Sequence, residues 1–492
     1  MLGPIQPNVP TARLTGLKEG RLGQDRLFEF APVDGYAGDA QAQHDVETAL
    51  RRLMTGETPT TRQFADSYGR VKNLALMFSS AYLDDSPDKA ARGQVLNAYK
   101  ILFTRMEPDT KFTIVCATEQ DKALVANVVS ESGIANPERV QLLLPGESSL
   151  TVWARDMMVP KFKPGDPGHT ALMAQEPLHN WHLSDSKIPK FITEANPTIA
   201  LDPEPALVTD GGDVQSNTKE SFAGYYSLAA TENKLHQGLM GTKFKDDVIH
   251  WYQDRNRVKV IETPPNTTFP FRFVPVEAPD GTHITHMEGN PDYRVPLLNA
   301  GEVSDARMYD DLSVGLFRQD LGKPVTVMGR DDPATPVQEE PATDHMDMGM
   351  TPIDDKTFLL GDPGLARQLL RGTKHDQPGF FNRDHPWDFD AYQRTLESKG
   401  YRVVRVPHHE PAKLGDPYIT YNNCLMERFE KDGREVRRVF LPVYGIPELD
   451  NHAQEVWKGE GFEVIPMPLG LLSANWGALR CISNWLDRSP QG

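Results

Sequence analysis

Cysteine is scarce in this chain, which has only three, Cys116, Cys424 and Cys481, among 492 residues. So few cysteines exclude a disulfide framework and indicate a reducing compartment. Long hydrophobic runs are missing too, since no stretch approaches the roughly 20 apolar residues of a membrane-spanning helix. The first residues lack a basic segment followed by an apolar one, so no secretory signal is visible. We therefore expect a cytoplasmic protein that does not bind a membrane.

Positive charge is in deficit. The chain has 52 Lys and Arg against 69 Asp and Glu, a formal net charge of −17. This balance argues against nucleic-acid binding through a basic surface. It favours a cationic partner, although an acidic surface that only keeps the protein in solution would give the same balance. The sequence leaves the oligomeric state open, a homo-oligomer included.

Metal-ligand spacings are also missing, because the chain has no His-Glu-x-x-His and no Cys-x-x-Cys motif. Residues that could hold zinc or iron do occur, at His345, Asp347, His408, His409 and Glu410. None of them has a recognised ligand spacing, so we expect neither a metal nor another cofactor. The last three are predicted to lie in a loop at the end of a strand.

One of the cysteines, Cys481, follows three acidic motifs in the chain. These motifs are Trp153-Ala154-Arg155-Asp156, Asp210-Gly211-Gly212-Asp213 and His345-Met346-Asp347. Together with Cys481 they supply a thiol, an imidazole and several carboxylates, which are the groups needed to attack a cationic carbon. The carbon of a guanidinium group is the obvious candidate.

The chemistry of guanidinium explains why these residue types would be combined. Its carbon is a poor electrophile because the charge is spread over three nitrogens, so a strong nucleophile is needed near neutral pH, and a thiolate suits that role. Carboxylates fix the planar N–H groups through paired, charge-assisted hydrogen bonds. One histidine could protonate the leaving nitrogen and then activate the water that opens the thiouronium intermediate.

The motifs resemble those of the guanidino-group-modifying enzyme superfamily. This superfamily includes arginine, agmatine and peptidylarginine deiminases, dimethylarginine hydrolases and amidinotransferases. The stretch from His345 to Leu360 is similar to the His-x-Asp strand pair of arginine deiminases, and Gly477 to Ser483 is similar to their cysteine loop. The stretch from Trp153 to Pro160 is nearer to agmatine deiminases.

The resemblance implies a role for each motif. Cys481 would be the nucleophile and His345 the general acid and base, while Asp156 and Asp347 would bind the guanidinium. One position departs from the pattern, because arginine deiminases have Glu before Gly-Gly-Asp to pair with the histidine, and this chain has the shorter Asp210. We assign the pairing role to Asp210. The remaining motif residues are assigned to substrate binding, namely Asp213, Trp153 and Arg155.

Each motif also has a purely structural explanation. A free cysteine is most often a small buried apolar residue, as we expect of Cys116 and Cys424. The Asp-Gly-Gly-Asp motif could form only a turn, because Asp and Gly favour turn geometry. Arg155 and Asp156 could be a surface ion pair of little consequence. Four motifs in the order of one family favour the functional interpretation.

Hydrophobic periodicity predicts helices that alternate with strands. Val95, Ala98, Tyr99 and Leu102 form a helical stripe. Two later helices end at glycines, as helices commonly do. The further predicted elements are strands at 112–116, 140–144, 401–406 and 462–466, helices around 124–129, 389–399 and 449–458, and a hairpin of 418–429 with 435–443 turned at 431–433.

This alternation predicts an α/β protein. The resemblance implies more, namely an α/β propeller (pentein) of five ββαβ modules around a pseudo-fivefold axis, with the site at the axis. We expect residues 1–85 to form a peripheral N-terminal segment with a short helix around 45–54. Residues 86–492 would form the catalytic domain, with a proline-rich and charged insertion at about 235–340.

The sequence thus favours an arginine-type deiminase, a hydrolase that acts through a covalent thiouronium intermediate on Cys481 and releases ammonia and a ureido product. An amidinotransferase would use the same intermediate but pass the amidino group to an amine. A guanidinium-binding protein without catalysis would keep the carboxylates and tolerate loss of the thiol. Arginine, agmatine and an arginine within a peptide are all open as the small cationic substrate.

Overall fold

A computed structural model of the chain describes most of the residues from 40 to 489. The described residues are 40–84, 91–134, 136–146, 149–178, 184–264, 267–269, 271–277, 283–329, 342–343, 345–376, 386–410 and 417–489. Within these ranges the longest apolar helices fall short of what a bilayer crossing requires.

Five of the seven sheets formed by the described residues share one strand order. In each of the five, two strands pair antiparallel and a third strand then pairs in parallel after a helical crossover; the antiparallel strands are consecutive in four of the sheets. The sheet of β5 (Val159–Lys163), β6 (Asp166–Glu176) and β7 (Ile199–Val208) is an example, with α5 (Ile188–Ala195) between its parallel strands and β1 (Arg62–Gln63) added at its edge. This is the predicted ββαβ module.

Three further modules follow along the chain. The second consists of β8 (Val214–Ser216), β9 (Ser221–Gly224) and β14 (Val325–Met328), with α6 (Tyr225–Leu239) and α8 (Asp305–Leu321). The third consists of β15 (Met350–Pro352), β16 (Thr357–Asp362) and β17 (Arg402–His409), with α10 (Pro363–Leu370), α11 (Pro386–Ser398) and a short strand β18 (Ile419–Thr420). The fourth consists of β19 (Leu425–Lys431), β20 (Arg434–Val443) and β21 (Glu463–Pro468), with α12 (Pro447–Gly459).

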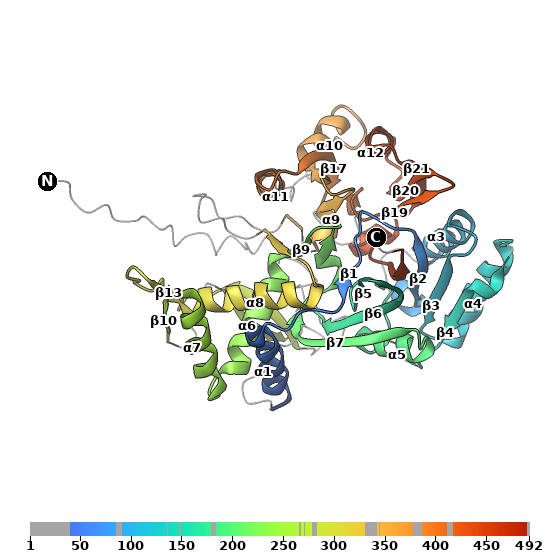
Figure 1. Ribbon diagram of the computed structural model, residues 1–492. Coiled ribbons are helices and arrows are strands. Elements are labelled where there is room, and N and C mark those ends of the chain that lie inside the picture. The colour runs from blue at the N-terminus through green and yellow to red at the C-terminus, as the bar shows by residue number, and fades with distance from the viewer. Residues whose placement is uncertain are drawn as a thin grey trace.

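The fifth module joins the two ends of the described chain. β22 (Ser483–Arg488) pairs antiparallel with β2 (Val71–Phe78), and β2 pairs in parallel with β3 (Lys111–Cys116). The module also contains β4 (Val140–Leu143), α2 (Ser80–Asp84), α3 (Ala91–Arg105) and α4 (Glu119–Glu131). Its pairing closes the ring of modules seen in Figure 1. The predicted α/β propeller is confirmed.

The pattern of α12 illustrates why these segments fold locally as they do. Proline at the start of the helix has the backbone angle that a first turn needs, and Glu448 and Asp450 place negative charge at the same end. Leu449, Ala453 and Trp457 recur at intervals of four and are all buried, so they form one apolar face. That face packs against the strands of its own module.

The predicted elements agree with the structure apart from small shifts at their ends. The helices predicted around 45–54, 95–102, 124–129, 389–399 and 449–458 correspond to α1 (Ala40–Thr55), α3, α4, α11 and α12. The predicted hairpin turns at Asp432 and Gly433, which both have positive φ. One difference matters for the site, because the first predicted hairpin strand is interrupted at 421–424 between β18 and β19.

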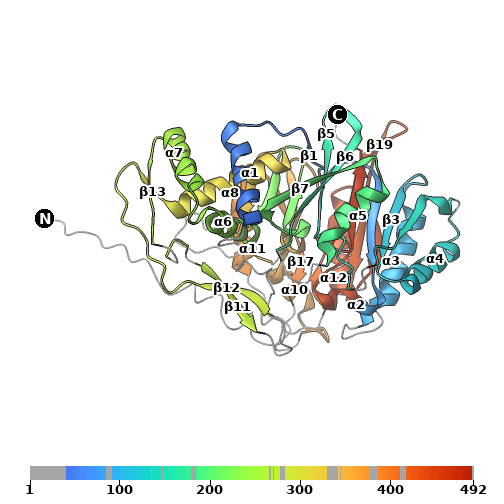
Figure 2. The ribbon, with the colours of Figure 1, turned by 90° about the horizontal axis from the view of Figure 1, so that it is seen from below.

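Two predicted regional boundaries need correction. β2 lies inside a sheet between β22 and β3, so residues 71–78 belong to the ring rather than to a peripheral segment. At the other boundary, β14 pairs with β9, and α8 packs on α6, so both belong to the second module. What projects from that module is α7 (Phe244–Asn256), a parallel pair of β10 (Lys259–Ile261) with β13 (Glu302–Ser304), and a hairpin of β11 (Phe271–Glu277) with β12 (His283–Gly289), as Figure 2 shows.

Candidate active site

Cys481 lies between a loop and the last strand of the ring. Its carbonyl accepts a hydrogen bond from the backbone N–H of Arg155 at 3.0 Å, and its side chain is buried. The loop before it approaches another motif closely, because a Cβ added to Gly477 would lie 2.3 Å from the ring of Trp153. Only glycine fits at that position. Two motifs from opposite ends of the catalytic region therefore meet at Cys481.

His345 lies between two carboxylates. Its Nε2 is 3.1 Å from Oδ2 of Asp210, and its Nδ1 is 3.7 Å from Oδ1 of Asp156. The other oxygen of Asp210 accepts a hydrogen bond from the backbone N–H of Leu178 at 2.8 Å, which orients the carboxylate. The backbone comes close here, since a Cβ added to Gly212 would be 2.6 Å from Nδ1 of His345. This approach lets Asp210 reach the histidine although it is shorter than Glu.

Asp156 is held by the same turn that carries Asp210. Its Oδ1 accepts a hydrogen bond from the N–H of Gly212 at 3.0 Å, and its backbone carbonyl accepts one from the N–H of Gly211 at 2.9 Å. The side chain of Gln175 donates to the same carbonyl at 3.0 Å. These contacts fix the Asp156 carboxylate beside the imidazole.

The thiol and the imidazole both have shifted pKa values. Burial lowers the pKa of His345, but the charge of Asp156 and hydrogen bonds with Asp210 and Cys481 outweigh burial and hold it well above its usual value. Burial and the charge of Asp347 raise the pKa of Cys481 to about 11, against the opposing effect of the hydrogen bond with His345. At neutral pH the site therefore combines an imidazolium with a neutral thiol.

Asp347 has one oxygen that is unused. It lies in α9 (Met346–Gly349) and is fully buried. Its Oδ2 accepts a hydrogen bond from Nη1 of Arg480 at 2.6 Å, whereas no donor in the described part of the chain reaches its Oδ1. A buried acceptor without a donor is costly. Oδ1 is therefore well suited to accept an N–H group from a cationic ligand.

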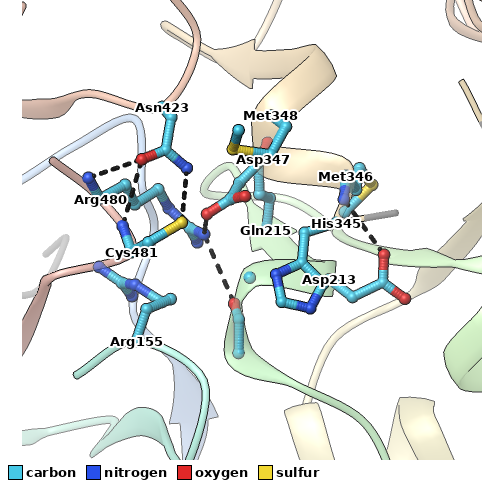
Figure 3. A network of polar contacts seen from close by, with 12 residues as sticks. Arg155, Asp213, Gln215, His345, Met346, Asp347, Met348, Asn423, Arg480 and Cys481 are labelled. Atoms are coloured by element: carbon cyan, nitrogen blue, oxygen red, sulfur yellow. Dashed lines mark hydrogen bonds and ion pairs between the residues drawn. The ribbon is translucent and has the colours of Figure 1, made fainter. Parts of the chain in front are cut away.

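Arg480 and its partner Asp66 are site residues that sequence reasoning missed. Two nitrogens of Arg480 donate to Asp66 at 2.9 and 3.2 Å. Another donates to Asp347, as Figure 3 shows. Burial lowers the pKa of Arg480, but the charges of Asp66 and Asp347 more than reverse that effect. The adjacency of Arg480 to Cys481 was the only signal in the sequence. Asp66 has none, because it lies in the segment predicted to be peripheral.

Asp213 does not face the thiol. Its carboxylate accepts hydrogen bonds from Oγ of Ser227 at 2.6 Å and from the backbone N–H of Met346 at 3.2 Å. Burial raises the pKa of Asp213 to about 7, although these hydrogen bonds oppose the shift. The carboxylate thus holds the backbone next to His345. These hydrogen bonds do not support its predicted role in substrate binding, because they join it to other residues of the chain.

Trp153 and Arg155 are both buried against aromatic side chains. The indole N–H of Trp153 donates to the hydroxyl of Tyr82 at 2.7 Å. The guanidinium of Arg155 lies over the ring of Trp485, 4.0 Å from its centre, and burial lowers its pKa to about 9. Its Nε and Nη2 have no hydrogen-bond partner among the described residues. Arg155 is therefore not part of a surface ion pair, and substrate binding by these two residues stays a prediction.

Asn423 is a further residue that the motifs did not indicate. It lies in the 421–424 interruption between β18 and β19, and its side-chain N–H donates to Sγ of Cys481 at 3.0 Å. A strand was predicted across this position, so nothing in the periodicity marked a turn. The paired asparagines Asn422 and Asn423 were the available signal, because Asn is depleted in strands.

The rival metal site has no support in the part of the chain that is described, where no three His, Cys, Asp or Glu side chains are grouped to hold an ion. His408 and His409 lie within β17, which corrects the prediction that they are in a loop. Both are buried, and Nε2 of His408 is 3.3 Å from the hydroxyl of Tyr418. Burial lowers the pKa of His408 to about 3, so its imidazole is neutral.

Comparison with known proteins gives matches to solved structures alone, since no family model and no curated protein matches the sequence. A protein provisionally described as an agmatine deiminase matches with a TM-score of 0.50 and 13% identity, over 88% of this chain and 96% of its own. The agmatine deiminases of C. jejuni and Enterococcus faecalis match with TM-scores of 0.48 and 0.49 and 11% identity, over the same shares. The chain thus has the pentein fold, the α/β propeller of guanidino-group-modifying enzymes.

Proposed function

We propose that this protein is a cysteine-dependent hydrolase of the guanidino-group-modifying superfamily, which converts a guanidinium into a ureido group and ammonia. The observation that carries the proposal is that no donor of the described residues reaches Oδ1 of buried Asp347, in a site that also contains Cys481 and the His345–Asp210 pair. An unused anionic acceptor beside a nucleophile and an acid–base group suits a cationic electrophile.

In the proposed reaction, Asp347 and Asp156 hold the guanidinium through its N–H groups. The cation offsets the negative charge of Asp347, which otherwise raises the pKa of Cys481, so the thiol releases its proton to solvent. Sγ then attacks the guanidinium carbon. The imidazolium of His345 protonates one terminal nitrogen, which leaves as ammonia and gives a thiouronium on Cys481.

The second half of the proposed reaction uses His345 in its neutral form. It removes a proton from a water molecule as the water attacks the thiouronium carbon. Collapse of the tetrahedral adduct breaks the C–S bond, and the proton of the adduct's hydroxyl passes to the departing sulfur, which leaves a neutral ureido product and restores the Cys481 thiol. Asp210 keeps the imidazole oriented through its 3.1 Å contact and stabilises the imidazolium that forms again.

The burial of the site favours a small substrate. Cys481 is 3% exposed, Asp156 is 2% exposed and Asp347 is completely buried. A guanidinium within a folded protein could not reach these groups without a large opening, whereas a free guanidine needs a much smaller one. Agmatine and free arginine are therefore the first candidates, and the likeness in fold to agmatine deiminases puts agmatine first.

The proposed function is tested by incubating the protein with agmatine, arginine and a peptidyl arginine. Ammonia and the ureido product are measured for each substrate, with Cys481→Ala as the control. Formation of both products by the wild type alone is expected. A new guanidine formed from an added amine, with no ureido product, would make the protein an amidinotransferase. Binding without any product in either protein would make it a guanidinium-binding protein.

A further inference from the structure

The interruption at 421–424 is tied to the turn that carries Asp347. The hydroxyl of Thr420 donates to the carbonyl of Met348. The side chain of Asn422 donates to the carbonyl of Gly349 at 2.9 Å, and the hydroxyl of Thr351 donates to the carbonyl of Asn422 at 2.6 Å. The segment therefore has a fixed position relative to the guanidinium-binding carboxylate.

On its other side, this segment contacts the cysteine loop through Asn423. Its Oδ1 accepts hydrogen bonds from the backbone N–H groups of Arg480 at 2.9 Å and Cys481 at 3.2 Å. Its Nδ2 donates to Sγ of Cys481 at 3.0 Å. All three contacts are drawn in Figure 3. One buried amide thus binds both the backbone and the side chain of the nucleophile's residue.

The orientation of this amide is determined by its partners. If the Asn423 amide were flipped, its NH₂ group would face two backbone N–H donors, and the N–H of Arg480 would keep only its 3.3 Å contact with the backbone carbonyl of Asn423. The oxygen must therefore face the backbone, which leaves the N–H group facing sulfur. A donor at sulfur favours the charged thiolate over the thiol.

We propose that Asn423 is a positioning residue that holds Sγ of Cys481 in place and stabilises its thiolate. This inference rests on the proposed function in so far as Cys481 is taken as the nucleophile. The geometry gives the amide two separate effects, since Oδ1 orders the loop and Nδ2 acts on the sulfur. A substitution can remove the second effect and keep the first.

The charges around the sulfur explain why such a donor is needed. Burial and the carboxylates Asp347 and Asp156 raise the pKa of Cys481, and the hydrogen bond and charge of His345 lower it. Tyr444 also lies within electrostatic reach of the thiol. The amide of Asn423 does not titrate. Its effect on the sulfur therefore stays constant over the pH range in which His345 changes charge.

The test compares wild type with Asn423→Asp by following alkylation of Cys481 with iodoacetamide against pH. The carboxylate still accepts from both backbone N–H groups, but it places an anionic acceptor against the sulfur. We expect the inflection of the alkylation profile to move up by about one pH unit or more, with about a tenfold or greater loss of rate at neutral pH. The melting temperature should stay within a few degrees of that of the wild type.

Three controls make the result decisive. Cys481→Ala identifies the alkylated residue. Cys116 and Cys424 should react slowly in any case, because both are buried and have raised thiol pKa values. Asn422→Asp makes the same change one residue earlier, where the side chain faces the carbonyl of Gly349, and should leave the inflection unchanged. If Asn423→Asp does not fold, Asn423→Ala is measured in its place and should move the inflection in the same direction.

An unchanged inflection in the folded Asn423 variant would overturn the proposal and leave the residue a purely structural role. Alkylation needs no substrate, so this outcome is independent of the substrate assay. A shifted inflection in a protein that turns over no guanidine would keep the role of Asn423 and reject the proposed function. Guanidine turnover with an unchanged inflection would keep the proposed function and reject the role of Asn423.

Discussion

At the scale of single residues, the thiol of Cys481 differs from the other two thiols in its surroundings. All three thiols pack in the hydrophobic core, but that of Cys481 also contacts a histidine and an amide donor. We expect Cys481→Ala to abolish turnover and to retain the fold, and mass spectrometry of quenched wild-type enzyme to detect an adduct on Cys481. Cys116→Ala is the matched control and should affect stability alone. Turnover by Cys481→Ala near the wild-type rate would reject the covalent mechanism.

Asp156 and Asp347, the two carboxylates proposed to bind the guanidinium, should be separable by their effects on stability. Loss of one partner of a buried charged pair costs about 3–5 kcal/mol, which corresponds to a decrease of roughly 10²–10⁴-fold in kcat/KM for either Asp156→Asn or Asp347→Asn. Asp347→Asn should also lower the melting temperature more, because Asp347 is a counter-ion of buried Arg480. Normal turnover by both variants would show that the substrate is not a guanidinium.

Asp210→Asn should act through the histidine. The folded-state pKa of His345 is raised partly by its hydrogen bond with Asp210, so the imidazolium is retained as pH rises until that raised pKa is passed. Removing the carboxylate charge lowers this pKa. We therefore expect kcat to fall and the alkaline limb of its pH profile to move to lower pH, with a smaller change in KM. A lower kcat with an unmoved limb would contradict the pairing role.

At the scale of elements, Asp213 connects the start of α6 to the backbone that follows His345. Its folded pKa of about 7 lies above the ordinary value. A raised carboxyl pKa gives stability that is present at acidic pH and is lost as pH rises toward 7. Asp213→Asn should therefore reduce the dependence of the melting temperature on pH in this interval. Its kcat/KM should stay within severalfold of the wild type, and a loss as large as that of Asp156→Asn would restore Asp213 to substrate binding.

The sequence predicted the regular elements better than the site that they carry. Amphipathic stripes and terminal glycines located α3, α11 and α12, because burial of one face is a local property of the sequence. The position of Asn423 depends on hydrogen bonds to two distant segments, so local pattern suggested an unbroken strand. The alternative of a surface ion pair at Arg155 fails for a similar reason, since only the fold brings Trp485 over it.

At the scale of the whole molecule, ring closure could not be predicted from periodicity. The pairing of β2 with β22 joins segments at opposite ends of the chain, and the resemblance alone supplied the five modules. The meeting of Cys481, His345, Asp210, Asp156 and Asp347 follows from that closure. The order of the motifs was therefore sufficient to nominate these five residues. The distances between them can be known only from the closed ring.

The whole protein should work without a metal, because its candidate nucleophile is a thiol and the described carboxylates and histidines are not grouped as ligands. Activity should survive exhaustive chelation, and elemental analysis of the purified protein should find no stoichiometric metal. Loss of activity on chelation that zinc or manganese restores would move the assignment to a metallohydrolase.

The pairing of β22 with β2 also bears on biosynthesis. A ribosome adds roughly 5–20 residues per second, so β2 waits on the order of 20 s or longer for the strand that completes its sheet. For almost all of that interval Cys481 has not yet been added to the chain, so the carboxylates that would bind a guanidinium lack their nucleophile. A nascent chain could therefore bury much of its core and still be unable to modify the free guanidines around it. Catalytic competence would arrive only when β22 has been made and has paired with β2.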